Sequence, residues 1–321
     1  MTQPNHVIAI DLMGGDDNPL TRLRAIQKFI IQNSQLNIQL FVGKFFHQKN
    51  QPVFQNLSKQ IKVILTDDVI QMDESPLLAL RQKRSSSLSK AIESVANKEA
   101  HAVLTAGNSG ALVAFAKYWL RVDEVVERPA LATVLPGYPK PTLLLDIGAS
   151  LEYRAEDLYA LAELGAKIAP KLFDCGSHPE VALLNVGTEH IKGHDTVQQA
   201  DRLLQASALN YLGFCEGSHL FSGYADVICC DGFVGNITLK ACEGLMKKLQ
   251  NKQHLKWWQK WFCQFIDVNL NPAQYNGALL LGLDGLVVKA HGNSDEEGFF
   301  HALLRTAEYV NKQTKWGQQI Q

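Results

Sequence analysis

The sequence predicts an α/β fold, a three-layer α/β/α sandwich around a mostly parallel sheet. Short apolar runs of strand length alternate along the chain with longer segments whose apolar residues have helical spacing. Most of these apolar runs end at a glycine-bearing loop, as strands do before a crossover helix. Because helices cover both faces of a parallel sheet, its strands are apolar throughout, and the two observations indicate the same architecture.

The expected elements follow that alternation. The apolar runs predict strands at 6–11, 37–42, 62–65, 102–105, 142–146, 181–186 and 226–230. Helical spacing predicts helices at 20–32, 86–96, 111–120 and 156–169. No low-complexity linker or internal repeat divides the chain, so residues 1–321 are expected to form a single domain, from which a helical arm at about 243–275 projects.

The composition excludes several classes of protein. The 321 residues carry 31 basic and 32 acidic side chains, and 46% are hydrophobic, which is typical of a globular protein. The net charge of −1 leaves no positive excess to neutralise phosphates, so a general nucleic-acid binder is not expected. The six cysteines form no spaced framework, the N-terminus lacks signal-peptide features, and no apolar run approaches ~18 residues. We therefore expect a reduced cytoplasmic protein, soluble or at most bound to a membrane surface.

The glycine-bearing loops are the expected ligand site. In sheets of this class, ligands bind beyond the carboxyl ends of the strands. We therefore expect the loops at 14–15, 107–110, 148, 187–193 and 232–236 to converge on one sheet edge.

Two of these loops can bind an anion, and each has a simpler interpretation. Gly14 and Gly15 can present backbone amides to an anion, but they also suit a tight turn, and the P-loop and dinucleotide patterns are absent. Asn108 and Ser109 stand at a predicted helix start, where they can hold a phosphate or cap the helix. The G-x-S-x-G pattern of a serine hydrolase is absent there.

The later loops add a cation and an amide. Lys192 lies between glycine positions after an apolar strand and can meet a phosphate or a developing oxyanion. Asn236 can donate to a carbonyl oxygen as its charge grows. His190 and His194 have metal-ligand spacing, but Gly193 lies between them and no second cluster completes a ligand set, so no metal site is predicted.

Nine segments in order, covering nearly the whole chain from residue 8 to about 310, resemble the PlsX family of phosphate acyltransferases. They are IDLMGGD (10–16), ESPLLALRQKRSSSLSKAI (74–92), TAGNSGAL (105–112), RPAL (128–131), LLDIGA (144–149), LLNVGTEHIKG (183–193), DGFVGNITLKACEG (231–244), GALLLGLDG (277–285) and AHGNS (290–294). Two departures are visible: Ser109 stands where the family usually has Thr, and Ser150 where it has Asn.

The resemblance implies the activity. Enzymes of this family make acyl phosphate from acyl carrier protein thioesters and inorganic phosphate, without a cofactor, at the entry to phospholipid synthesis. It implies a fold related to phosphotransacetylases and isocitrate-dehydrogenase-like enzymes, and a homodimer at the inner face of the cell membrane. It also implies that the product passes to a glycerol-3-phosphate acyltransferase. By resemblance, Lys192 and Asn236 are the catalytic pair, and Lys192→Ala should abolish turnover. The substrate-binding residues are then Gly14, Gly15, Asn108, Ser109, Thr188, Asp231 and His291.

Two alternatives stay open. One is a metal-dependent decarboxylating dehydrogenase-like enzyme of the same broad fold, which needs a clustered Asp set and a nicotinamide pocket that the sequence does not provide. The other is a non-catalytic module that docks carrier protein and membrane enzymes. Phosphate-dependent release of thiol from acyl carrier protein separates the enzyme from both.

The arm combines five lysines with three tryptophans and contains no acid from 245 to 266. On a helix, the lysines that recur every four residues form one ridge, with the aromatic residues mostly opposite. This composition suits an anionic membrane surface, while the same face can also pack in a dimer and the lysines can meet an acidic carrier protein. The predicted membrane contacts are Lys256, Trp257, Trp258, Lys260, Trp261 and Phe262. Without the arm's five lysines, 26 bases face 32 acids, so the remainder has a net charge of −6.

Overall fold

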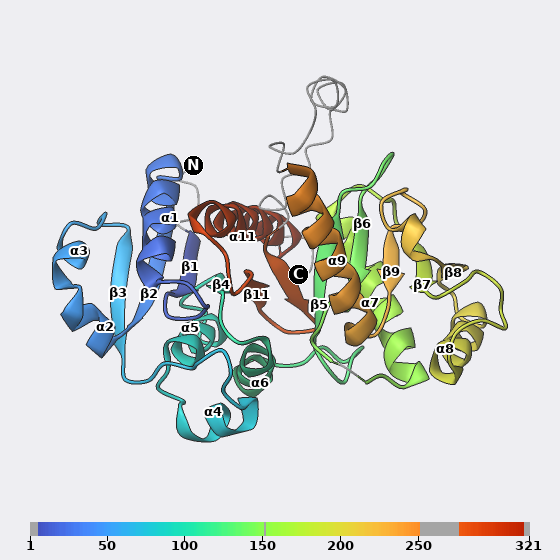
Figure 1. The fold of residues 1–321 in the computed structure, drawn as a ribbon, viewed down its shortest axis with the longest axis horizontal. Helices are drawn as coiled ribbons and strands as arrows, with labels where there is room; N and C mark the ends of the chain where they lie inside the picture. Colours follow the sequence, from blue (N-terminus) through green and yellow to red (C-terminus); the bar gives the residue numbers. More distant parts are fainter. Residues whose placement is uncertain (1–5, 151, 251–275, 318–321) are drawn as a thin grey trace.

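The computed structural model describes residues 6–150, 152–250 and 276–317, which form an 11-stranded sheet covered by helices (Figure 1). The strands are β1 (His6–Asp11), β2 (Leu36–Gly43), β3 (Ile61–Thr66), β4 (Ala102–Thr105), β5 (Ala130–Leu135), β6 (Thr142–Leu145), β7 (Glu180–Leu184), β8 (Asn210–Cys215), β9 (Val227–Cys229), β10 (Ala278–Leu281) and β11 (Leu286–Lys289). The helices are α1 (Pro19–Gln32), α2 (Lys44–Lys49), α3 (Gln51–Gln55), α4 (Pro76–Gln82), α5 (Ser87–Ala96), α6 (Ser109–Trp119), α7 (Ala155–Leu172), α8 (Asp195–Gln205), α9 (Gly232–Gln250) and α11 (Glu296–Gly317), with a short 3-10 turn, η1 (Gly217–His219).

The sheet consists of two parallel groups joined by two reversed strands. Its order is β3-β2-β1-β4-β11-β10-β5-β6-β9-β7-β8. The first five strands are parallel to one another, and so are the last four. Three antiparallel pairings, β11–β10, β10–β5 and β5–β6, connect the groups. The predicted mostly parallel α/β sheet is thus confirmed.

The expectation that all the glycine loops leave one sheet edge is wrong. An odd number of antiparallel steps separates the two groups, so they run in opposite directions. The loops after β1 and β4 therefore leave one edge, and those after β6, β7 and β9 leave the other. The error arose because β5 and β10 were not predicted as strands, and these two strands set the relative direction of the groups.

Helices cover both faces, as expected for a three-layer sandwich. One apolar cluster lies between the sheet and α1, α7, α8 and α11. The cluster on the opposite face includes buried side chains of α4, α5 and α6, and Leu239 of α9 packs against it. In Figure 1, α11 lies above β11, and α4, α5 and α6 lie below the strands.

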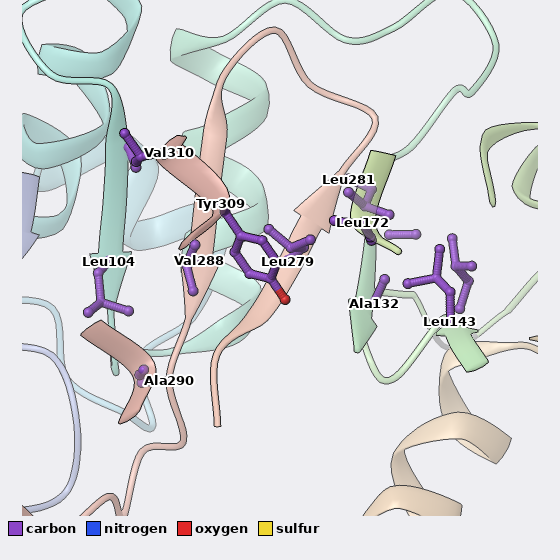
Figure 2. Close-up of a cluster of buried hydrophobic side chains, with 14 of the residues drawn as sticks. Leu104, Ala132, Leu143, Leu172, Leu279, Leu281, Val288, Ala290, Tyr309 and Val310 are labelled. Carbon is purple, nitrogen blue, oxygen red and sulfur yellow. The ribbon is translucent and has the colours of Figure 1, made fainter. Parts of the chain in front are cut away.

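One core continues across the junction of the two groups. Figure 2 shows Leu279 and Leu281 of β10 beside Ala132 of β5, between Val288 of β11 and Leu143 of β6. Tyr309 and Val310 of α11 and Leu172 of α7 close this region (Figure 2). Because all of these side chains are buried, the reversed strands fix the two groups to each other through packing.

The proposed arm boundary needs correction. Residues 243–250 continue α9 without a break from Gly232, so the first part of the predicted arm belongs to a helix of the body. The membrane-contact prediction falls outside the described residues, since it concerns Lys256, Trp257, Trp258, Lys260, Trp261 and Phe262. Within the described chain, no helix is both long and apolar enough to cross a bilayer.

Candidate active site

A solvent-open cavity of about 1340 Å³ lies where the two strand groups meet. Its lining comes from α6, α9, the middle strands and the loops after β1, β6 and β11. The cavity lies over one face of the sheet, at β5 and β10, the two strands that join the groups. Loops that leave opposite edges of the sheet can therefore line the same cavity from two sides. The polar residues of the lining are Asp16, Ser109, Asn236, Lys240, Glu243, Lys289, His291 and Asn293.

The loop after β1 is held from below by a buried carboxylate. Asp11 is 2% exposed, and its Oδ1 accepts hydrogen bonds from the amides of Met13 and Gly14 at 3.2 and 3.3 Å. Its Oδ2 accepts from Thr105 Oγ1 at 2.8 Å, which ties the end of β1 to the end of β4. Gly14 therefore forms a tight turn. The next polar group, Asp16, reaches the cavity, and its amide donates to Gly292 O at 2.8 Å.

A buried arginine supports the same loop. Arg22 of α1 is 0% exposed, and its guanidinium donates to the carbonyls of Leu12 and Asp17 at 3.0 and 3.1 Å. Its Nη1 has no hydrogen-bond partner in the described part of the chain and lies beneath Gly15, 2.8 Å from where a Cβ would be. Arg22 thus positions the loop after β1 and places a positive charge beneath it.

Lys289 at the end of β11 is a buried cation in the cavity. It is 9% exposed, and its Nζ donates to Ala106 O at 3.3 Å and to Ala290 O. Burial lowers the pKa of Lys289 to about 8, opposed by the negative charges of Asp16 and Asp11. Lys289 is therefore mostly charged at neutral pH, in a site where solvent screens its charge little.

The start of α6 lies beside this lysine in the cavity lining. Asn108 caps the helix: its Oδ1 accepts from the amide of Ala111 at 3.0 Å, and its Nδ2 donates to the carbonyls of Met72 and Glu74. All three of these side-chain hydrogen bonds are made to the protein, so the capping interpretation describes this side chain. Ser109 opens α6 and lines the cavity, beside the free amides of the first helical turn.

Across the cavity, Asp146 shapes the loop after β6. Its buried carboxylate accepts hydrogen bonds from the amides of Leu131, Gly148, Ala149 and Ser150 and from Tyr153 Oη, at 2.9 to 3.1 Å. Burial raises the pKa of Asp146, and these donors oppose that rise. Five donors on one carboxylate fix this loop, whose residue Gly148 faces the cavity.

Asn236 stands against this loop. A Cβ on Gly148 would lie 3.4 Å from Asn236 Cβ, Cγ and Nδ2, and Gly148 has φ +123°, a conformation that side chains rarely adopt. The first turn of α9 packs equally closely, since a Cβ on Gly235 would overlap the carbonyl oxygen of Asp146. The Asn236 amide lines the cavity and has no hydrogen-bond partner among the described residues. Asp231 instead caps α9, its Oδ1 accepting from the amide of Val234 at 2.9 Å.

His291 lies at the other end of the cavity and is paired. Its Nε2 is 3.0 Å from Glu243 Oε1 of α9, and its amide donates to Asn276 Oδ1. This pair joins the loop after β11 to α9. Of the residues predicted for the site, Ser109, Asn236 and His291 therefore line one cavity, and Gly14, Gly15, Asn108 and Asp231 hold its walls or adjoin them.

Lys192 and Thr188 do not line this cavity. Both are exposed on the loop after β7, which Asn185 holds through hydrogen bonds with the carbonyl of Lys192 and the amide of Val186. His190 on the same loop pairs with Asp201 of α8 at 3.2 Å. No group of three His, Cys, Asp or Glu side chains suited to a metal ion occurs in the described parts of the chain. A catalytic role for Lys192 stays a prediction.

Two important residues were missed from the sequence. Lys289 directly precedes the AHGNS segment, but β11 was not predicted as a strand, so its terminal lysine was not recognised as part of a loop site. Asp146 closes an apolar strand before Gly148, as Asp11 closes one before Gly14. A carboxylate at the end of a buried strand was the signal that could have found Asp146.

Comparison with known proteins shows the family of this chain. Residues 6–316 match the model of a family described as "Fatty acid synthesis protein". The chain is 42% identical over 314 residues to the phosphate acyltransferase of Shewanella sp. (strain MR-4), covering 92% of this chain and 90% of that protein. The chain belongs to the phosphate acyltransferase family. A second member, from Shewanella baltica (strain OS155), is 42% identical over 317 residues, which cover 93% of this chain and 91% of that one.

Solved structures extend the likeness to the fold. A EutD phosphotransacetylase from Staphylococcus aureus superposes with a TM-score of 0.60 at 15% identity, covering 96% of this chain and 94% of that one. A branched-chain phosphotransacylase from Enterococcus faecalis V583 gives 0.59 at 16% identity, covering 95% and 99%. These confirm the predicted phosphotransacetylase-like fold. Membership of the phosphate acyltransferase family identifies an enzyme that transfers acyl groups to phosphate in lipid synthesis.

Proposed function

We propose that the cavity between α6 and α9 is where phosphate attacks the thioester of an acyl carrier protein. The observation that carries this proposal is the buried cation Lys289 beside the start of α6, together with the side-chain amide of Asn236 on another part of the same lining, which has no hydrogen-bond partner among the described residues. Lys289 and the start of α6 suit an anion, and the Asn236 amide suits a carbonyl oxygen. A phosphate acyltransferase must hold these two groups next to each other.

Phosphate is held by Lys289 and the first turn of α6. Helix N-termini bind phosphate because their free amides point outward and the helix dipole favours negative charge. Ser109 adds a hydroxyl that can donate to a phosphate oxygen. The positively charged Arg22 beneath the neighbouring loop strengthens the local potential.

Asn236 positions the thioester carbonyl and donates to its oxygen as negative charge develops. A phosphate oxygen forms a bond to the carbonyl carbon, the carbon–sulfur bond breaks, and the thiolate leaves and takes up a proton. No enzyme nucleophile is required, because phosphate is already an anion. In keeping with this, burial raises the pKa of the Cys215 thiol to about 12 and also raises that of Cys242, so neither thiol is activated. Lys192 remains the sequence-based prediction for the oxyanion.

The expected partners are part of the proposal. Lys240 is exposed at the cavity and can meet an acidic carrier protein. One face of α9 exposes Phe233 and Ile237, which are 58% and 54% exposed, and this pair supports a homodimer. We propose that the enzyme is cytoplasmic and acts at an anionic membrane surface. There it would deliver acyl phosphate to a glycerol-3-phosphate acyltransferase.

The test is the release of thiol from hexadecanoyl acyl carrier protein by the full-length protein, with and without phosphate. We expect release only with phosphate, together with acyl phosphate that hydroxylamine traps as a hydroxamate. Asn236→Ala should lower the maximal rate by about 10² because it removes an oxyanion donor. Equal release without phosphate would indicate a thioesterase and contradict the proposal. No release under either condition would favour the docking module.

A further inference from the structure

We infer that a second, apolar pocket against α9 holds the acyl chain and sets the preferred chain length. This inference rests on the proposed function of the neighbouring cavity. The pocket is partly open to solvent, its space together with that opening is about 490 Å³, and its walls are mostly apolar. They include Leu135, Ile147, Phe221, Leu239, Cys242 and Met246.

The pocket continues the cavity in which the thioester is expected to react. Ile147, Leu239, Glu243, Ala278 and His291 line both spaces, so the two share a wall. A substrate with a polar thioester and a long hydrocarbon chain needs this arrangement of a polar chamber that opens onto an apolar one.

The residues of α9 give the chain a direction. Asn236 faces the polar cavity, Leu239 lines both spaces one turn later, and Cys242 and Met246 line the apolar pocket. From Asn236 to Met246 the helix rises about 15 Å at 1.5 Å per residue. A chain with its carbonyl at Asn236 would therefore run along α9 toward Met246.

The chemistry of the lining favours hydrocarbon over a second anion. Among the described residues that line this pocket, His291 is the only one with a basic side chain, and it is paired with Glu243 at 3.0 Å. Burial raises the pKa of the Cys242 thiol, with a smaller contribution from the negative charge of Glu243, so the thiol stays neutral. The Glu243–His291 pair stands on the shared wall, where it marks the boundary between the polar and apolar spaces.

The test compares two neighbours on α9. Met246→Trp fills the pocket, whereas Leu245→Trp adds the same bulk to the exposed face and keeps that face apolar. We compare kcat/KM for hexadecanoyl and butanoyl acyl carrier protein at saturating phosphate. Met246→Trp should lower the long-to-short ratio at least tenfold, since each buried methylene is worth about fourfold in affinity. Leu245→Trp should leave the ratio unchanged.

Met246→Ala provides a variant with the opposite effect. It enlarges the pocket, so the ratio of octadecanoyl to hexadecanoyl activity should rise above that of the wild type. If both Met246 variants retain activity with the wild-type ratios, the inference is wrong. If the wild type releases no thiol with phosphate at any chain length, the proposed function fails instead, and the two failures are therefore distinguishable.

Discussion

The loop after β11 and the loop after β7 look alike in sequence but occupy different places in the fold. Each loop follows a buried strand and contains a histidine and a glycine, and each has a lysine, which ends the strand itself at β11 and lies within the loop after β7. Lys289 is 9% exposed in the cavity, whereas Lys192 is exposed on a loop whose Val186 and Ile191 are 81% and 83% exposed. The local pattern is shared, but the position of the strand in the sheet decides which loop forms the cavity.

Substitution of the two lysines, Lys289 and Lys192, should cause the largest losses of activity. Lys289→Met keeps the length of the side chain and removes its charge, so kcat/KM for phosphate should fall by about 10² to 10³. Lys192→Ala should lower kcat severely, to a rate that is still measurable, while leaving the KM for phosphate unchanged, if Lys192 acts on the oxyanion. Steady-state kinetics with both substrates varied measures this, and circular dichroism checks folding. If the KM for phosphate rose in Lys192→Ala but not in Lys289→Met, phosphate binding would be assigned to Lys192 and not to Lys289.

Asp146 holds the cavity loop after β6, and Asn185 holds the exposed loop after β7. Substituting these two residues should change the free energy of unfolding by different amounts. In the wild type, backbone N–H groups donate to both oxygens of the Asp146 carboxylate. Asp146→Asn replaces one of these oxygens with an NH2 group, whose hydrogens would face N–H donors. We therefore expect the free energy of unfolding to fall by about 3 kcal/mol. The matched variant, Asn185→Ala, removes two hydrogen bonds from an exposed loop and should cost less than about 1 kcal/mol. Urea unfolding measures both changes. Equal losses would show that the cavity loop is no more rigidly held than the exposed one.

The pH dependence of phosphate use should identify the titrating lysine. An amine is charged below its pKa, and the pKa of Lys289 is about 8, so kcat/KM for phosphate should be retained below pH 8 and fall above it. The fall should approach tenfold per pH unit. Lys192→Ala should keep this inflection at its reduced rate, and Lys289→Met should lose it. An inflection that persists in Lys289→Met would assign the titration to another group.

The smallest expected effect concerns two hydroxyls. Ser109→Ala removes one hydrogen bond to phosphate, worth about 1 kcal/mol, so the KM for phosphate should rise about fivefold. Thr188→Ala, on the loop after β7, should leave that KM unchanged, and any role in binding the acyl donor would appear in the KM for the thioester. Ser109→Thr, which restores the usual family residue, should behave like the wild type.

Most of the sheet could be predicted from the sequence because parallel strands are apolar and end at glycine loops. The strands at 6–11 and 102–105 match β1 and β4 residue for residue. β5 and β10 were not predicted as strands, although ALATVL and ALLL are apolar runs. Their antiparallel direction could not be read from the sequence, because it depends on pairings between residues far apart in the chain.

The site was predictable where a single loop carries the information. Asn236, Ser109 and His291 line one cavity, and each lies at or near the end of an element that the sequence makes recognisable, while their roles stay predictions. The roles of Asn108 and Asp231 as helix caps follow from hydrogen bonds that only the structure shows. Lys289 escaped prediction because its burial and its neighbours Asp11 and Asp16 come from strands and loops over 270 residues away.

The most direct test of the central claim is a crystal structure of the full chain with inorganic phosphate. We predict phosphate with an oxygen within hydrogen-bond distance of Lys289 Nζ and of the first turn of α6, near Ser109. Phosphate bound instead at the loop of 187–193, with the cavity between α6 and α9 unchanged, would contradict the account.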